Sequence, residues 1–213
     1  SKQGSAPGAL AADVWGEIVH DSIEHITTEQ YDKTAITTLP EALQAETDDI
    51  LERHLSAASQ QTVDRATEAL YDVALPQYAE TTTCMEVAGA SQLFAEYPTL
   101  TAVSADSQYF VGGRTDLLYQ TKTGDWKLAD LKTGSPAQPG TQQHEQYTWQ
   151  LNTYAWLLEQ VHDITIEDAK LVYVYPEVTE MSVNIDRSRT ENRLIELSRA
   201  LEVDGNSNLS RKP

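Results

Sequence analysis

The feature that most constrains the fold is a change in the spacing of apolar residues at Gln92. Upstream of it, apolar residues recur at three- and four-residue intervals, as in helices; downstream, they alternate every second position, as in β-strands. The segments with the shorter period are Leu93 to Tyr97, Gln108 to Tyr119 and Trp126 to Lys132. They are separated by Pro98, by Ala105-Asp106-Ser107 and by Thr123-Gly124-Asp125. This order predicts an antiparallel meander of three strands.

A long helix and a second kind of strand follow the meander. Gly and Pro residues at 134–140 break the pattern, and Thr141 can cap a helix that runs to about Val161. The apolar run from Ala169 to Tyr175 is rich in β-branched residues, which is typical of a strand buried on both faces. A helix that connects neighbouring strands makes them parallel. The chain therefore predicts an α/β core with a mixed β-sheet flanked by helices.

Helices are also expected on both sides of this core. Asp13 is a candidate N-cap for a first helix, whose apolar positions are Trp15, Ile18, Val19, Ile23 and Ile26. Two further helices, from Pro40 to about Ser59 and from Thr62 to about Ala74, stop at Pro76 and read as a helical insertion at about 40–75, a cap over the core. Residues 77–91 leave loop, helix and strand open. The last helix is expected from about Ser188 to Leu201, so we predict a lead-in at 1–12, one domain at 13–202 and a tail at 203–213.

Composition excludes several classes of protein. Apolar residues make up 40% of the 213 residues and charged residues 23%, which fits a packed globular domain rather than a disordered or fibrous chain. No apolar run approaches the length of a membrane span, so we expect a soluble, cytoplasmic protein. A single cysteine, Cys84, cannot supply an internal disulfide or an iron–sulfur cluster. Because the chain opens on Ser1 rather than Met, a piece of a longer polypeptide is one option.

The charge is strongly negative and unevenly distributed. The formal net charge is −18, of which residues 187–213 contribute +2 and the remainder −20. Such a balance ordinarily repels nucleic acid. Carboxylates on every predicted helix together with only seven lysines resemble proteins of salt-loving organisms. At molar salt the Debye length falls to about 3 Å, so only contact-distance interactions with DNA would matter. We therefore expect activity in high salt.

Three charged residues lie where strands should be buried. Asp130 and Lys132 are two positions apart and project from the same face of a strand, whereas Leu131 points to the other face. Asp116 lies in an apolar part of the preceding strand, and pairing across the intervening turn can bring it near Asp130. Two buried carboxylates repel each other unless a cation lies between them, and Mg²⁺ or Mn²⁺ prefers such oxygen ligands. A solvated Asp130–Lys132 pair is the alternative.

Further segments help to decide between a metal site and a solvated ion pair, because these segments occur in a recognisable order along the chain. They are Gly16-Glu17-Ile18-Val19-His20, Glu96, Gly113-Arg114-Thr115-Asp116, Asp130-Leu131-Lys132-Thr133-Gly134 and Tyr147-x-x-Gln150-Leu151-x-x-Tyr154. Together they resemble the RecB-like branch of the PD-(D/E)XK nucleases, over the first helix and about Leu93 to Tyr175. The resemblance implies a restriction-endonuclease-like core, and the single cysteine points to the cluster-free nuclease domain of RecB- and AddA-type helicase-nucleases.

The resemblance also implies roles for individual residues. Asp116, Asp130 and the backbone carbonyl of Leu131 would bind Mg²⁺ or Mn²⁺, with His20 completing the metal site. Lys132 would orient and help deprotonate the attacking water and stabilise charge on the phosphate. Gln150 and Tyr154, on one helical face with Tyr147, would position Lys132, water or the DNA backbone. The implied reaction is hydrolysis of a phosphodiester bond.

Each of the remaining candidates also has a structural interpretation. His20 can be an ordinary helix-face histidine, and His25 misses the spacing of a metalloprotease pair. Glu96, a secondary acidic feature of the family, can be an exposed strand residue, and Arg114 can simply balance charge. Tyr147 and Tyr154 can pack the helix onto the sheet. The arginines from Arg187 to Arg199 can form a solvated face or track phosphates.

Three functions follow from these interpretations. The first is a Mg²⁺-dependent deoxyribonuclease, the exonuclease module of a helicase-nuclease in DNA recombination and repair, with DNA and a helicase domain or subunit as partners. The second is a non-hydrolysing DNA-binding or scaffolding module that keeps the nuclease fold. The third is a metal-free acidic domain that binds a protein partner through residues 1–186, whose formal net charge is −20.

Overall fold

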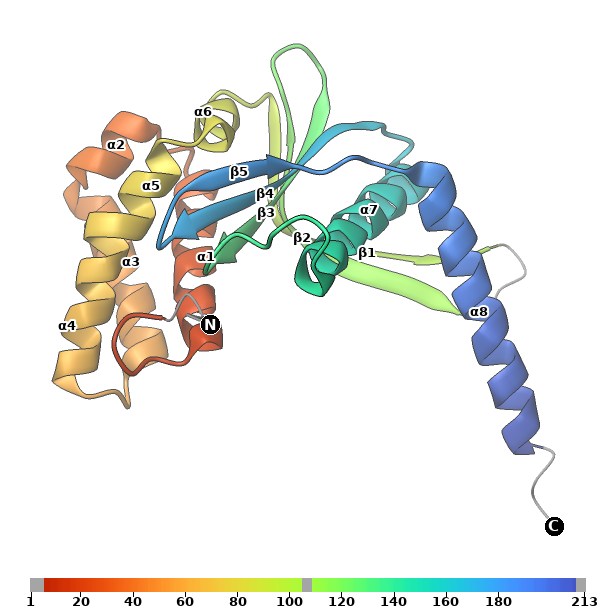
Figure 1. Ribbon diagram of the computed structural model, residues 1–213. Helices are drawn as coiled ribbons and strands as arrows, with labels where there is room; N and C mark the ends of the chain where they lie inside the picture. Colours follow the sequence, from red (N-terminus) through yellow and green to blue (C-terminus); the bar gives the residue numbers. More distant parts are fainter. Residues whose placement is uncertain (1–5, 105–108, 210–213) are drawn as a thin grey trace.

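The computed structural model describes residues 6–104 and 109–209, with side chains through residue 201. The predicted turn at 105–107, the expected strand start at Gln108 and both extreme ends of the chain lie outside these residues. Five strands form one mixed sheet in the order β1-β2-β3-β4-β5, with helices against both of its faces (Figure 1). This arrangement confirms the predicted α/β class and is consistent with a restriction-endonuclease-like core.

The sheet has the predicted connections. Strands β1 (Gln92–Ala102), β2 (Phe110–Gln120) and β3 (Trp126–Thr133) form the antiparallel meander. Helix α7 (Gln142–His162) then crosses over to β4 (Ile166–Tyr175), which pairs in parallel with β3. A short strand that the sequence did not suggest, β5 (Thr179–Ser182), pairs with β4 at the edge.

Proline interrupts fewer elements than its chemistry suggested. Strand β1 continues through Pro98, which was expected to end it; β1 is an edge strand, where a missing N–H breaks no second ladder. Pro76 was expected to stop a helix, but α4 (Gln60–Ala69) runs through a π-helical turn (Leu70–Ala74) into α5 (Leu75–Ala79). The N–H of Leu75 donates to the carbonyl of Leu70, five residues back. This wider turn shifts the hydrogen-bond pattern ahead of the proline and accommodates it.

The remaining helices of the N-terminal half are α1 (Ala12–Thr28), α2 (Lys33–Thr38), α3 (Glu41–Leu55) and α6 (Thr82–Ala88). The predicted N-cap at Asp13 is wrong, because Ala11 caps α1 without a side-chain hydrogen bond and Asp13 lies in the first turn. Pro40 precedes α3 rather than opening it, and the segment 77–91, left open above, is largely helical.

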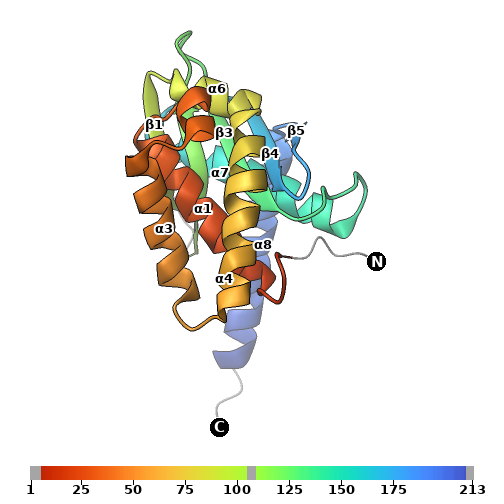
Figure 2. The same cartoon turned by 90° about the vertical axis from the view of Figure 1, so that its left-hand side faces the viewer.

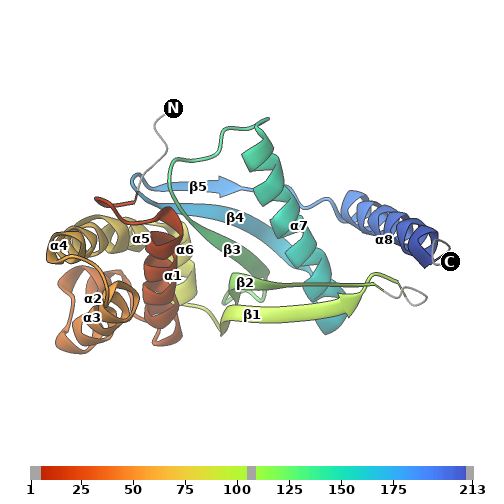
Figure 3. The same cartoon turned by 90° about the horizontal axis from the view of Figure 1, so that it is seen from below.

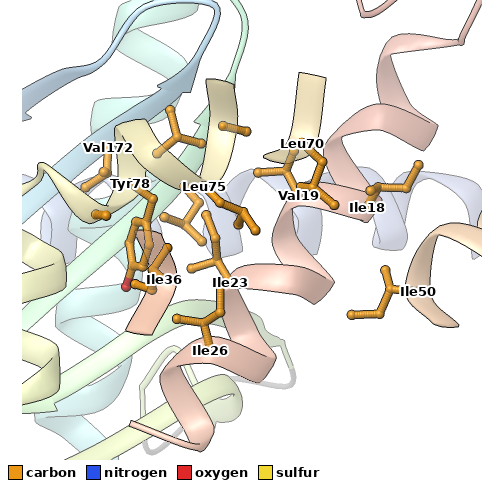
Figure 4. Close-up of a cluster of buried hydrophobic side chains, with 14 of the residues drawn as sticks. Ile18, Val19, Ile23, Ile26, Ile36, Ile50, Leu70, Leu75, Tyr78 and Val172 are labelled. Carbon is orange, nitrogen blue, oxygen red and sulfur yellow. The ribbon is translucent and has the colours of Figure 1, made fainter. Parts of the chain in front are cut away.

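The core lies on the two faces of the sheet. Helices α1 to α6 cover one face and share a cluster of buried side chains that includes Ile18, Ile23, Leu70 and Val172 (Figures 2 and 4). Residues 40–75 therefore supply part of this core rather than only covering it. Helix α7 covers the other face and packs Leu151 and Leu158 against the sheet (Figure 3).

The last helix, α8 (Arg187–Leu209), lies beside α7 at the end of the molecule opposite the α1–α6 bundle (Figure 3). It extends past the predicted end at Leu201 into the expected tail. Within the described ranges, every helix is too short or too polar to cross a bilayer.

Candidate active site

Strands β2 and β3 separate at the point where their acidic residues begin. Their pairing ends at Leu117 and Ala129, and the next positions along the two strands are Asp116 and Asp130. There the Oδ2 atom of Asp116 accepts a hydrogen bond from the backbone N–H of Leu131, at 2.6 Å. A carboxylate thus takes the place of the next ladder carbonyl. The divergence leaves room at the sheet for buried polar side chains.

Asp130 and Lys132 lie together, as the strand alternation predicted. Leu131 packs into the core cluster beneath α1, on the opposite face. The side chain of Asp130 is 2% exposed and forms an ion pair with the Lys132 ammonium. Neither Asp130 oxygen has another polar partner among the described residues. The Lys132 ammonium also lies 4.6 Å from the centre of the Tyr147 ring, an aromatic contact that favours a cation.

His20 reaches this point from α1. Its Nε2 atom lies 3.0 Å from the carbonyl oxygen of Leu131. Because a carbonyl only accepts hydrogen bonds, Nε2 carries the proton in the neutral ring, and Nδ1 is left with its lone pair. Nδ1 lies 3.6 Å from Oδ2 of Asp116. Two electron-rich atoms therefore face each other, an arrangement that a bound cation would stabilise.

Glu96 brings a third candidate ligand from β1. The register of β1 and β2 places it level with Asp116, between the pairs Ala95–Leu117 and Tyr97–Thr115. Its φ angle is 50°, a left-handed conformation that is unfavourable for a residue other than glycine. Its carboxylate pairs with Nε of Arg114 at 3.0 Å. One ligand atom each from His20, Glu96 and Asp116 lies within 4.8 Å of the others.

Electrostatics reflects this crowding of buried charge. Burial, followed by the neighbouring Asp130 carboxylate, raises the pKa of Asp116 well above its usual value, although the Leu131 N–H opposes the shift. Burial and the Lys132 ammonium lower the pKa of His20. Burial alone would lower the pKa of Lys132, but the Asp130 and Asp116 carboxylates outweigh it and raise that pKa. Without a metal, the site holds a neutral imidazole, a firmly protonated lysine and a carboxylate that resists ionisation.

Helix α7 forms another wall of the site. Gln150 Nε2 donates to the Tyr154 hydroxyl at 2.8 Å, and burial, with the Asp130 and Asp116 carboxylates, raises the pKa of Tyr154 despite that bond. A Cβ atom at Gly113 would overlap the Tyr154 ring, so this position requires glycine. The paired glycines before Arg114 were a sequence signal for this close approach.

The donor set fits a divalent cation. The buried carboxylate of Asp130, which has no hydrogen bond, the partly buried carboxylate of Asp116 and the imidazole lone pair of His20 converge where the strands separate. Carboxylate oxygens are the ligands that Mg²⁺ and Mn²⁺ prefer, and an imidazole nitrogen is a common ligand of divalent transition-metal ions. Residues that would hold the ion are His20, Glu96 and Asp116, with Asp130 alongside.

This set differs from the predicted ligands in two respects. Glu96, which the sequence analysis did not include among the ligands, lies with His20 and Asp116. Asp130 pairs with Lys132, and the carbonyl of Leu131 accepts a hydrogen bond from His20. The roles of Asp130 and Leu131 as metal ligands stay predictions. The level positions of Glu96 and Asp116 depend on the β1–β2 register, which no short motif encodes. Arg114 balances Glu96 directly, and His25 is outside the cluster.

One comparison, with a protein family, agrees with this chemistry. Residues 2–205 match the family described as the PD-(D/E)XK nuclease superfamily. No curated protein matches the chain significantly. Among 24 similar chains of solved structures is one described as "Crystal structure of SSO0001". It is 19% identical, with a TM-score of 0.39, over 88% of this chain and 74% of that chain.

Proposed function

Because the chain belongs to the PD-(D/E)XK nuclease superfamily, whose members are generally metal-dependent nucleases, we propose that it hydrolyses phosphodiester bonds in DNA with Mg²⁺ or Mn²⁺. The observation that supports this proposal most is the convergence of Asp116, Asp130 and Lys132 with His20 where β2 and β3 separate. When bound, the ion would lower the pKa of water and neutralise charge on the phosphate.

The chain's own residues would divide the remaining work. His20, Glu96 and Asp116 would hold the ion, and the raised pKa of Asp116 indicates that it would bind the ion most readily once deprotonated. Lys132, held by Asp130 and the Tyr147 ring, keeps its proton at neutral pH. Lys132 is therefore better suited to donating hydrogen bonds, which orient water or stabilise charge on the phosphate, than to acting as a base.

The branch of the superfamily and the biological setting are part of the proposal. A histidine on the first helix and the Gln150–Tyr154 pair on α7 support a RecB-like nuclease, and the single cysteine supports the branch without an iron–sulfur cluster. We place it as the exonuclease module of a RecB- or AddA-like helicase-nuclease that works in the cytoplasm in DNA recombination and repair. The charge of −18 supports work in high salt.

The direct test is cleavage of linear DNA by the purified protein with Mg²⁺ or Mn²⁺ in molar KCl. Asp116→Ala, Asp130→Ala and Lys132→Ala should each abolish cleavage, while circular dichroism shows the fold intact. Arg53→Ala, which changes a side chain of α3 that is 64% exposed, is a matched control that should leave cleavage unchanged. Cleavage that persists in all three site variants contradicts the assignment.

The non-hydrolysing alternative is separated by metal binding. A scaffold need not bind metal at this site. If the protein is such a scaffold, calorimetric titration with Mn²⁺ should show no binding that depends on His20 and Asp116; if it is the enzyme, such binding should be present. The presence of both carboxylates and the lysine favours the enzyme.

A further inference from the structure

A polar groove lies between helices α7 and α8, away from the diverging strands. It has a volume of about 320 Å³. Its lining combines an aromatic ring, two arginines, two carboxylates and hydrogen-bonding side chains, among them Thr148, Trp149, Asn152, Arg189, Arg193, Glu145 and Asp186. A flat ring beside guanidinium groups is the chemistry that proteins use for bases and phosphates of nucleic acids.

The Trp149 ring of the groove is already in contact with a cation. The Arg193 guanidinium lies over the Trp149 ring, with its central carbon 4.4 Å from the ring centre. Trp149 is partly buried against a small core cluster that contains Trp156 and Leu194, so the ring is held in position. A base that stacks here would contact a fixed π surface and a positive charge together.

The walls of the groove are fixed by hydrogen bonds. Asn152, 6% exposed, donates through Nδ2 to the carbonyls of Thr148 (2.9 Å) and Asn184 (3.1 Å). Its Oδ1 accepts from the N–H of Asp186 at 2.7 Å. Arg187 binds both oxygens of Glu159 with donor–acceptor distances of 2.7 to 3.1 Å. These bonds join the start of α8 to α7, so the groove is formed without a ligand.

The cations of the groove are available for an anion. Arg189 and Arg193 are exposed and have no ion pair among the described side chains, in contrast to Arg187. Asp186, an acidic residue of the groove lining, caps α8 by accepting from the N–H of Arg189 at 3.0 Å. In a chain of charge −18, the groove is formally neutral, because Glu145 and Asp186 offset Arg189 and Arg193, and it therefore repels a phosphate backbone less than the acidic remainder of the chain.

The groove and the candidate active site share α7. At 100° per residue, Tyr147, Gln150 and Tyr154 lie on one side of this helix, and Thr148, Trp149 and Asn152 lie on the other. The two sites are thus separated by about one helix diameter, 10–12 Å.

We propose that the α7–α8 groove binds a single-stranded segment of the nucleic acid substrate, on the side of α7 opposite to the candidate active site. One base stacks on the Trp149 ring in place of the Arg193 guanidinium, which then contacts the backbone together with Arg189. The inference rests on the proposed nuclease function and specifies its substrate. A single strand fits because bases inside a duplex are stacked on each other, and only an unstacked base can lie on a ring within a groove.

The test is binding of a fluorescein-labelled oligo(dT) in EDTA, followed by fluorescence anisotropy, so that cleavage plays no part. Trp149→Leu keeps an apolar side chain and removes the stacking surface, and it should weaken binding roughly 5- to 100-fold. Arg193→Ala should weaken binding severalfold and flatten its salt dependence. Arg199→Ala, on the same helix outside the groove, removes the same charge and should change binding little.

Melting temperatures identify variants that fail to fold. A further variant, Glu145→Gln, removes the negative charge of a groove carboxylate and should therefore tighten binding of the oligonucleotide. The proposal is overturned if Trp149→Leu and Arg193→Ala bind as well as Arg199→Ala. It is also overturned if a duplex or an RNA of equal length binds more tightly and responds to the same variants. Failure of the proposed function would show differently, as absence of DNA cleavage with every metal whatever the binding.

Discussion

Replacing Asp116 with asparagine should stabilise the metal-free protein while abolishing cleavage. Asp116 is nearly buried, and the adjacent Asp130 carboxylate opposes its ionisation, which raises its pKa. Asparagine keeps an oxygen that can accept the hydrogen bond from the Leu131 N–H, now 2.6 Å long, and removes the charge. The substitution therefore removes repulsion without losing the contact that joins β2 to β3.

The expected gain is about 1 kcal/mol in the free energy of unfolding, in the range seen when a destabilised active site is relieved. For a chain of 213 residues this corresponds to about 2–4 °C in melting temperature. Because the folded pKa of Asp116 is raised, native stability falls as pH rises from the unfolded to the folded pKa. The advantage of asparagine should thus be full above the folded pKa and disappear towards pH 4.

The assay is thermal unfolding in EDTA, and then with Mn²⁺, for the wild type and two variants. Mn²⁺ should raise the melting temperature of the wild type and have little effect on Asp116→Asn. Asp130→Asn is the matched comparison, and it should destabilise because it deprives the Lys132 ammonium of its carboxylate. A lower melting temperature for Asp116→Asn than for the wild type in EDTA at pH 7 would refute this electrostatic reasoning.

Three other predictions concern the surroundings of the site. Gly113→Ala should destabilise by about 1–3 kcal/mol through overlap with the Tyr154 ring, and Tyr154→Ala in the same chain should recover part of the loss in denaturant unfolding. Glu96→Gly should relieve the left-handed backbone and stabilise the metal-free protein by about 1 kcal/mol, while calorimetry shows weaker Mn²⁺ binding; unchanged Mn²⁺ affinity would remove Glu96 from the ligand set. The melting temperature should rise from dilute buffer to molar KCl, since screening weakens repulsion among carboxylates; a fall would exclude adaptation to high salt.

Local pattern predicted much of the architecture. The change from helical to alternating spacing at Gln92 located the meander, and the helix capped by Thr141 indicated the parallel pairing of β3 with β4. Strand alternation also placed Asp130 and Lys132 on one face. These features depend on backbone periodicity over a few residues, which the amino-acid order specifies directly.

Features that depend on distant segments were not accessible in the same way. The hydrogen bond from His20 to the Leu131 carbonyl joins residues 111 positions apart, and the position of Glu96 opposite Asp116 requires the exact hairpin register. The prediction that a helix stops at Pro76 was wrong because the π-helical turn ahead of this proline has no sequence signature that we recognised. Tertiary packing decided all three.

The bond between the Asp116 carboxylate and the Leu131 N–H connects a metal ligand to the backbone of the sheet. An ion on the same oxygen would compete with this N–H for its electron density, so we expect occupancy of the centre and exchange of one amide proton to be linked. Deuterium uptake at Leu131 should consequently rise as Mn²⁺ is added, which makes a single backbone amide a gauge of metal loading in the intact, unlabelled protein.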